Sequence, residues 1–253
     1  MGALHEGHLS LVRNARDRCD RLVVSIFVNP SQFGPDEDFD DYPRELAKDM
    51  DLLQQEGVDV LFSPRRDQIY RDGHQTRVSL HQLTAPLCGL NRPDHFAGVT
   101  TIVAILLQII QPNTVYLGRK DYQQFRIIER MVQDLFIPTE VVGLPTIRER
   151  DGLALSSRNA NLSEQGRKRA NSIIRGLQNA KDAFSNGTTS VDTLRNIIAS
   201  EVKKRCDAVH YIAIVDKKTL QPIDNVNRPA VMAVAALIEG VRLIDNLEIE
   251  PIQ

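Results

Sequence analysis

Met1-Gly2-Ala3-Leu4-His5-Glu6-Gly7-His8 opens the sequence, and an apolar periodic stretch and a β-branched run at residues 22–28 follow it. His5 and His8 lie three residues apart, where a loop is expected to become a helix. A helix N-terminus carries unpaired N–H groups and partial positive charge, and imidazoles donate hydrogen bonds to phosphoryl oxygens. The motif therefore indicates a phosphate site, although taken alone it is better explained as a loop with two surface histidines.

Strands and helices are predicted to alternate through residues 1–146. Short apolar runs predict strands at 22–28, 58–62, 115–117 and 140–142, with an edge strand at 76–80. Helical periodicity predicts helices from residue 9, from about 43 (with Leu46, Met50, Leu52 and Leu53 inward), at 96–110 and at 123–135. This alternation is typical of an α/β, doubly wound, Rossmann-like parallel sheet, whose ligands bind beyond the carboxyl ends of the strands.

The pattern changes after residue 146. Long helices are predicted at 163–184 and 191–205, followed by strands at 209–215, 230–237 and 241–244. Asn186-Gly187 is a left-handed C-cap signal at the end of the first of these helices. We expect a smaller α+β domain over residues 147–253.

Composition excludes several classes of protein. The formal net charge of -2 provides no basic surface for nucleic acid or anionic lipid. The three cysteines are scattered without Cys-x-x-Cys spacing, which fits a reducing compartment. No secretory signal is recognised, and the longest apolar run is too short to span a bilayer. We therefore expect a cytoplasmic protein with neither nucleic acid nor a membrane as partner.

Polar motifs follow two of the predicted strands. Residues 29–33 (Asn-Pro-Ser-Gln-Phe) come after the 22–28 strand, and residues 118–124 (Gly-Arg-Lys-Asp-Tyr-Gln-Gln) after the 115–117 strand. Glycine permits close approach of a nucleotide, and lysine neutralises phosphate. An Asn-Pro turn and a charged helix cap would explain the same residues without a ligand.

Two further motifs combine hydroxyl, guanidinium and imidazole groups. Leu155-Ser156-Ser157-Arg158-Asn159 places two hydroxyls beside an arginine, which suits a polyphosphate. Arg92-Pro93-Asp94-His95-Phe96 precedes the helix at 96–110. Helix capping explains either motif equally well on its own.

In chain order, the five motifs lie at residues 5–8, 29–33, 92–96, 118–124 and 155–159. This order and spacing resemble the pantoate–β-alanine ligase (pantothenate synthetase) family over essentially the whole chain, and the closing Arg242-Leu243-Ile244-Asp245-Asn246 adds to the resemblance. The resemblance implies an ATP- and Mg²⁺-dependent ligase, active as a homodimer, that condenses pantoate with β-alanine. Pantoate would attack the α-phosphorus of ATP to give pantoyl adenylate and pyrophosphate. The amine of β-alanine would then displace AMP.

The resemblance also implies contacts with ATP from both domains. Those of the first domain would come from Met1, Gly2, His5, Gly7, His8, Gly118, Arg119 (through its backbone), Lys120 and Asp121. Those of the second domain would come from Ile147 and Leu155 beside adenine and from Ser156, Ser157 and Arg158 closing on the triphosphate.

Substrate contacts and catalytic roles are implied in the same way. Asn29, Gln32 and Gln124 would hold pantoate, with Gln32 also near β-alanine. His8 matches the position of a proton donor and His5 contacts phosphate. Lys120, Ser156 and Arg158 complete the expected catalytic set, while no metal ligand is assigned.

The sequence departs from the family pattern in a few places. Family members usually carry a helix and a strand ending in Pro-Thr before the position of Met1. Without that strand we expect unmade ladder hydrogen bonds beside the 22–28 strand. Arg119 stands where an acidic or neutral residue is more usual, and Asp94 where glycine is. Two alternatives are another His-x-Gly-His nucleotidyltransferase and a truncated, non-catalytic nucleotide-binding remnant.

Overall fold

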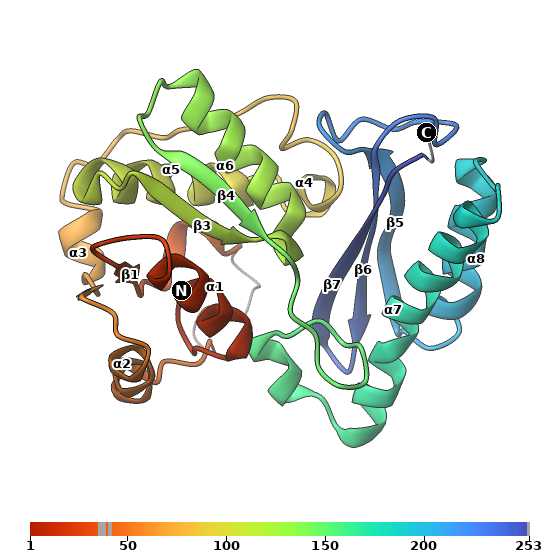
Figure 1. Cartoon of the computed structure of the whole chain (residues 1–253), viewed down its shortest axis with the longest axis horizontal. Coiled ribbons are helices and arrows are strands. Elements are labelled where there is room, and N and C mark those ends of the chain that lie inside the picture. The colour runs from red at the N-terminus through yellow and green to blue at the C-terminus, as the bar shows by residue number, and fades with distance from the viewer. Residues whose placement is uncertain (35–38, 40–41, 252–253) are drawn as a thin grey trace. The chain divides into compact units, whose positions relative to one another are not determined.

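The computed structural model describes residues 1–34, 39 and 42–251 (Figure 1). The chain forms two compact units. The first comprises Met1–Thr84, Arg92–Arg119 and Gln124–Ile147, and the second comprises Ala85–Asn91, Lys120–Gln123 and Arg148–Gln253. The division near residue 147 lies next to the expected boundary, but two short segments expected in the first domain group with the second unit. The domain assignment therefore stays a prediction.

Helices and strands alternate along the first half of the chain, as the periodicity predicts. In chain order they are α1 (Glu6–Arg16), β1 (Val23–Ser25), η1 (Pro30–Gln32), α2 (Leu46–Gln55), β2 (Val60–Phe62), α3 (Arg66–Ile69), α4 (Cys88–Asn91), α5 (His95–Ile110), β3 (Thr114–Gly118), η2 (Arg119–Asp121), α6 (Tyr122–Asp134) and β4 (Glu140–Leu144). β1 pairs with β2 and β3 pairs with β4, and both pairs are parallel.

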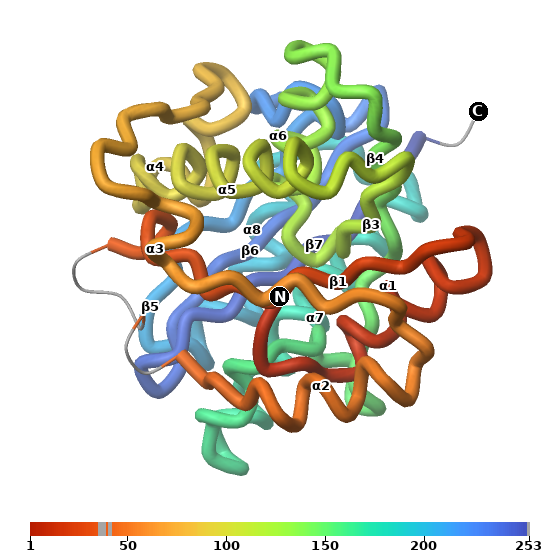
Figure 2. The backbone as a smooth tube through the Cα atoms, turned by 90° about the vertical axis from the view of Figure 1, so that its left-hand side faces the viewer, coloured from red at the N-terminus to blue at the C-terminus, as the bar shows by residue number. Residues whose placement is uncertain are grey.

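Strand β3 is covered on both faces, which is the mark of a doubly wound sheet. Tyr116 packs with a core formed by α1, α2 and β1, whereas Val115 and Leu117 pack with a second core formed by α5 and α6. Figures 1 and 2 both show α5 and α6 on the side of β3 that lies away from α1. Because successive side chains of a strand point to opposite faces, this alternation places helices on both sides of β3.

The strand predicted at residues 22–28 is shorter than expected, since β1 covers three residues. Beyond it, Ile26 N–H still donates to the Phe62 carbonyl (3.0 Å). On the other edge, the Met1 amine donates to the Ser25 carbonyl (2.9 Å), and Phe27 N–H donates to the Met1 carbonyl (3.1 Å). Within the described residues of the first unit, the hydrogen-bonded ladders are therefore two parallel pairs, with Met1 alongside β1.

Two local predictions in the first unit are wrong. Residues 76–80 form no strand, because the backbone N–H and carbonyl of Val78 bond to the hydroxyls of Thr101 and Thr100 on α5. Helix α2 turns Asp49 and Leu53 inward and leaves Leu46 and Met50 43% and 50% exposed. Apolar periodicity predicted the wrong inner face for α2, because that face carries the buried carboxylate of Asp49.

The second unit is an antiparallel sheet covered by two helices (Figure 1). It contains η3 (Ser157–Asn161), α7 (Glu164–Ser185), α8 (Val191–Val202), β5 (Ala208–Asp216), β6 (Ala230–Ile238) and β7 (Val241–Ile249), in the strand order β5-β6-β7. Gly187, at φ +96°, follows α7 as the cap signal predicts. These elements confirm the expected α+β organisation, with β7 longer than predicted.

The core of the second unit explains the order of its elements. Central strand β6 is almost wholly apolar and buried. Ile173 and Leu177 of α7 and Leu194 and Ile198 of α8 pack against it in one cluster. No helix among the described residues is long and apolar enough to cross a membrane.

Candidate active site

The N-terminal turn, residues 1–8, leads into α1 through a reciprocal histidine cap. His5 is the N-cap residue, and its Nδ1 accepts the Gly7 N–H (3.1 Å). The Nδ1 of His8 in turn accepts the His5 N–H (3.4 Å), and the two ring centroids lie 4.1 Å apart. A nitrogen that accepts an N–H carries no proton, so each neutral ring has its proton on Nε2. The cap thus makes both histidines Nε2–H donors.

The start of this turn is held by a carboxylate that the sequence did not reveal. Asp49 of α2 accepts the N–H groups of Ala3 (3.0 Å) and Leu4 (2.7 Å). Its side chain is buried, at 1% exposure. The available signal was its spacing of four residues from Leu53, which is buried on the same helical face.

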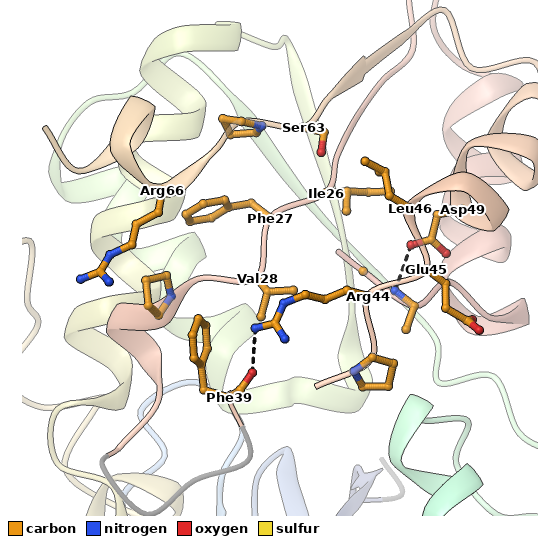
Figure 3. Close-up of a pocket in the computed structure, with 15 residues that line it drawn as sticks. Ile26, Phe27, Val28, Phe39, Arg44, Glu45, Leu46, Asp49, Ser63 and Arg66 are labelled. Carbon is orange, nitrogen blue, oxygen red and sulfur yellow. Dashed lines mark hydrogen bonds between the residues drawn. The ribbon is translucent and has the colours of Figure 1, made fainter. Parts of the chain in front are cut away.

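A pocket of about 310 Å³ lies beside the N-terminal turn (Figure 3). Gly2 and Ala3 line it, with Phe27 and Val28 after β1 and Ser63 after β2. Arg44, Glu45, Asp49 and Arg66 bring charges of both signs to its walls. The pocket lies at the carboxyl ends of two parallel strands, which is where open α/β sheets bind ligands.

The side chain of Asn29 stabilises the turn that carries Gln32. It is 2% exposed, and its Oδ1 accepts the Ser31 N–H (3.3 Å) and the Tyr70 hydroxyl (2.7 Å). Its Nδ2 donates to the Gly98 carbonyl (3.1 Å). Burial raises the pKa of Tyr70, which keeps the phenol protonated as a donor. The Nδ2 of Asn29 also lies 3.5 Å from Oε1 of Gln32, so Asn29 is placed to support the predicted substrate site through both the backbone and the Gln32 amide.

Two residues of the Arg92-Pro93-Asp94-His95-Phe96 motif hold the backbone of Gln32. Its carbonyl lies 2.8 Å from Nδ1 of His95 and accepts a hydrogen bond from Arg92 (3.2 Å). Gly98 allows this approach, because a Cβ there would lie 2.1 Å from the Ser31 carbonyl oxygen. The structure thus joins two of the sequence motifs, and it adds Tyr70 and Gly98, which the sequence reasoning missed.

The segment after β3 places its predicted nucleotide contacts in a tight turn. Gly118 ends β3, and η2 contains Arg119, Lys120 and Asp121. The Arg119 side chain lies against Gly143 of β4, which agrees with a role for its backbone alone. Lys120 is half-buried, its carbonyl accepts Nδ2 of Asn246 (2.8 Å), and Asp121 is exposed.

Two glutamines follow this turn with different surroundings. Gln123 is 7% exposed, accepts the Cys88 N–H (3.0 Å) and donates to the Pro86 carbonyl (2.7 Å). The oxygen and the nitrogen of its side-chain amide therefore both bond to backbone groups. Gln124, the predicted substrate contact, is half-buried in the first turn of α6.

The serine–arginine motif lies on an anchored loop of the second unit. Ser156 caps η3 by accepting the Arg158 N–H (3.3 Å), so its predicted capping role is confirmed. Arg148 pairs with buried Asp245 through two hydrogen bonds of 2.6 and 2.9 Å and forms a bridge with Ala154. Ile147, Leu155, Ser157 and Arg158 are half-buried.

Comparisons with known proteins agree on one family. The chain matches the family described as pantoate-beta-alanine ligase over residues 1–248. A pantothenate synthetase of Heliobacterium modesticaldum is 47% identical over 99% of this chain and 89% of its own length. One of Geobacter sulfurreducens is 49% identical over 97% of this chain and 87% of its own length.

Solved structures give the same result. Pantothenate synthetase from Thermus thermophilus matches with a TM-score of 0.96 and 46% identity, covering 99% of this chain and 91% of that one. A pantoate-beta-alanine ligase from Francisella tularensis, solved with beta-gamma ATP and beta-alanine, matches with a TM-score of 0.80 and 41% identity, covering 98% and 86%. These matches confirm the predicted fold class.

Proposed function

The chain belongs to the pantoate–β-alanine ligase family, and on that premise we propose how its residues serve the reaction. It is an ATP-dependent ligase that forms pantothenate from pantoate and β-alanine. The two alternatives, another nucleotidyltransferase and a non-catalytic remnant, are not favoured by these relatives. The residue roles, the metal, the assembly and the location are the proposals.

The first step activates pantoate as an adenylate. A pantoate carboxylate oxygen attacks the α-phosphorus of ATP, the bond to the bridging oxygen breaks, and pyrophosphate leaves. Negative charge grows on the phosphate oxygens as this bond breaks. His5 and His8 supply Nε2–H hydrogen-bond donors to that charge, His8, at the position of the proton donor, to the leaving pyrophosphate and His5 to phosphate. The proton stays on Nε2, because a neutral imidazole that lost it would become an anion. The reciprocal histidine cap is the observation that carries this assignment.

The second step transfers the pantoyl group to β-alanine. The neutral amine attacks the acyl carbon of the adenylate, the bond from that carbon to the phosphate oxygen breaks, and AMP leaves with that oxygen. The proton that the nitrogen loses passes to the departing phosphate. Gln32 and Gln124 hold pantoate through their amides, with Gln32 also near the amine. Asn29 supports Gln32, because its Nδ2 lies 3.5 Å from Oε1 of Gln32 and its bonds to Ser31, Tyr70 and Gly98 hold the turn.

The remaining nucleotide contacts divide by chemistry. Gly118, the Arg119 backbone and Asp121 suit the ribose, Lys120 suits phosphate as a point charge, and Ile147 and Leu155 suit adenine. Ser156, Ser157 and Arg158 suit the triphosphate, as hydroxyls and a guanidinium that bind phosphate oxygens. Met1, Gly2 and Gly7 contribute backbone to the nucleotide. Residues 147–253 would act as a lid that excludes water from the adenylate.

Mg²⁺ would arrive on the phosphates of ATP. It usually keeps several waters and binds through substrate phosphates with one or two carboxylates. The described part of the chain holds no group of three His, Cys, Asp or Glu side chains placed to bind a metal. When bound, the ion would neutralise the charge of the phosphates.

Replacement of His8 by Ala tests the assignment. Loss of one preorganised donor slows a reaction by about 10²–10³-fold, and we expect that loss in pantoate-dependent ATP–pyrophosphate exchange. His81→Ala, at an exposed histidine outside the site, is the control and should exchange at the wild-type rate. An unchanged rate in His8→Ala would remove His8 from the reaction.

Assembly and location complete the proposal. We infer a homodimer, supported by the family resemblance, and expect sedimentation equilibrium to give about twice the 28.5 kDa of one chain. A cytoplasmic location is supported by the scattered spacing of the three cysteines, which fits a reducing compartment. Cell fractionation with a periplasmic marker would test it.

A further inference from the structure

Asp49 is a buried charged side chain for which the reaction described above has no use. It is 1% exposed and lies in the first turn of α2, where the helix dipole favours an acidic side chain. A carboxylate is rarely taken out of water unless hydrogen bonds replace the lost solvent. The partners of Asp49 therefore indicate what it does.

Those partners are two consecutive amides of the N-terminal turn. Oδ2 accepts the Ala3 N–H at 3.0 Å and Oδ1 accepts the Leu4 N–H at 2.7 Å, across 46 and 45 residues of sequence. Figure 3 shows the Asp49 carboxylate at the wall of the pocket with a dashed hydrogen bond to this turn. Each carboxylate oxygen thus holds one amide, and together they fix the orientation of the Ala3–Leu4 peptide.

The backbone at this point needs such support. Ala3 has φ +49°, in the left-handed region that residues with a side chain rarely adopt. Such conformations persist where the surrounding structure imposes them, and they gather at active sites. His5, the N-cap of α1, is two residues further on. The direction in which the chain leaves Ala3 therefore sets where the two imidazoles lie.

We propose that Asp49 is a positioning residue for adenylation: it holds Ala3 in the left-handed conformation, so that His5 and His8 meet the phosphates. This inference rests on the proposed roles of His5 and His8. Asp49 itself touches the backbone of the turn and no reacting atom. An asparagine could not replace it, because its amide offers one acceptor and would turn an NH₂ group toward a backbone N–H.

Asp49→Asn tests this role, with Asp51→Asn as the matched control. Asp51 lies two residues further along α2 and is exposed. Small misplacement of reacting groups costs up to about 10²-fold in rate. We expect kcat of pantoate-dependent ATP–pyrophosphate exchange to fall roughly 10- to 100-fold in Asp49→Asn and to stay unchanged in Asp51→Asn. Assays run well below the melting temperature of each variant, with folding checked by circular dichroism.

A second variant separates positioning from general stability. Glycine adopts positive φ at no steric cost, so adding Ala3→Gly to Asp49→Asn should recover part of kcat. The proposal is overturned if Asp49→Asn melts at a lower temperature yet keeps its kcat, or if Ala3→Gly brings no recovery. His8→Ala is assayed alongside. If kcat falls in His8→Ala but not in Asp49→Asn, only the positioning role of Asp49 is rejected. If kcat falls in neither variant, the proposed function of the N-terminal turn is rejected as well.

Discussion

At the scale of the residue, the substrate turn depends on the absence of a side chain at Gly98. A Cβ there would lie 2.1 Å from the Ser31 carbonyl oxygen and 2.7 Å from the Gln32 nitrogen. Gly98→Ala would gain about 1 kcal/mol of helix propensity in α5, but overpacking costs about 1–3 kcal/mol and the contact is with backbone. We expect a net loss of stability in urea unfolding and a raised KM for pantoate.

Gly176→Ala is the comparison for this prediction. It lies within α7, and its Cβ would meet the Ile198 carbonyl oxygen at 3.1 Å, a much milder contact. The same gain in helix propensity should then nearly offset the cost of crowding, so that the free energy of unfolding changes little. The KM for pantoate should not change. Equal stability losses in the two variants would contradict the role given to Gly98.

The residues of the site were predictable from the sequence only where their chemistry is local. The His-x-Gly-His spacing and the helix that follows it predicted the N-terminal turn, because both depend on neighbours within eight residues. Asp49 and Tyr70 bond to residues 46 and 41 positions away in sequence. The spacing of Asp49 from Leu53 could indicate that it faces inward, but not which residues it would bond to. Their contacts depend on how α2 and the segment near Tyr70 pack.

At the scale of the element, strand β7 anchors the loop that carries Ser156 and Arg158. Buried Asp245 of β7 holds Arg148, which also donates to the Gly152 carbonyl (3.1 Å). Removing one partner of a buried ion pair costs about 3–5 kcal/mol, because the other charge is left unpaired. We expect Asp245→Ala to lower the free energy of unfolding by that amount in chemical denaturation. The KM for ATP should rise, because the loop that carries Ser156 and Arg158 is then held less firmly.

Glu250→Ala is the control at the end of the same strand. Glu250 pairs with Lys217 and its side chain is 62% exposed, and exposed pairs contribute at most about 1 kcal/mol. A loss in Asp245→Ala as small as that of Glu250→Ala would show that the buried pair does not anchor the loop.

The helices and most strands followed their apolar periodicity, and the failures have specific causes. The 76–80 strand was lost to side-chain hydroxyls of α5, which took the hydrogen bonds of Val78. The inner face of α2 was misjudged because a carboxylate occupies it. In both places a polar side chain forms hydrogen bonds with the backbone, and the periodicity of apolar residues contains no information about such bonds.

At the scale of the whole molecule, the order of elements predicted an α/β unit and an α+β unit. Among the described residues, small cores lie on the two faces of β3 in the first unit, and a larger core surrounds β6 in the second. Strand pairing was harder to predict, since periodicity names strands but not their partners. The structure has two parallel pairs in the first unit.

The most direct test of the central claim is AMP release by the purified chain with ATP, Mg²⁺, pantoate and β-alanine, omitting each in turn. A pantoate–β-alanine ligase must release AMP in step with pantothenate, and full turnover must require both organic substrates. Pantoate with ATP alone should support pyrophosphate exchange but little AMP release. AMP release that continues without pantoate, or no turnover with all components present, would contradict the claim.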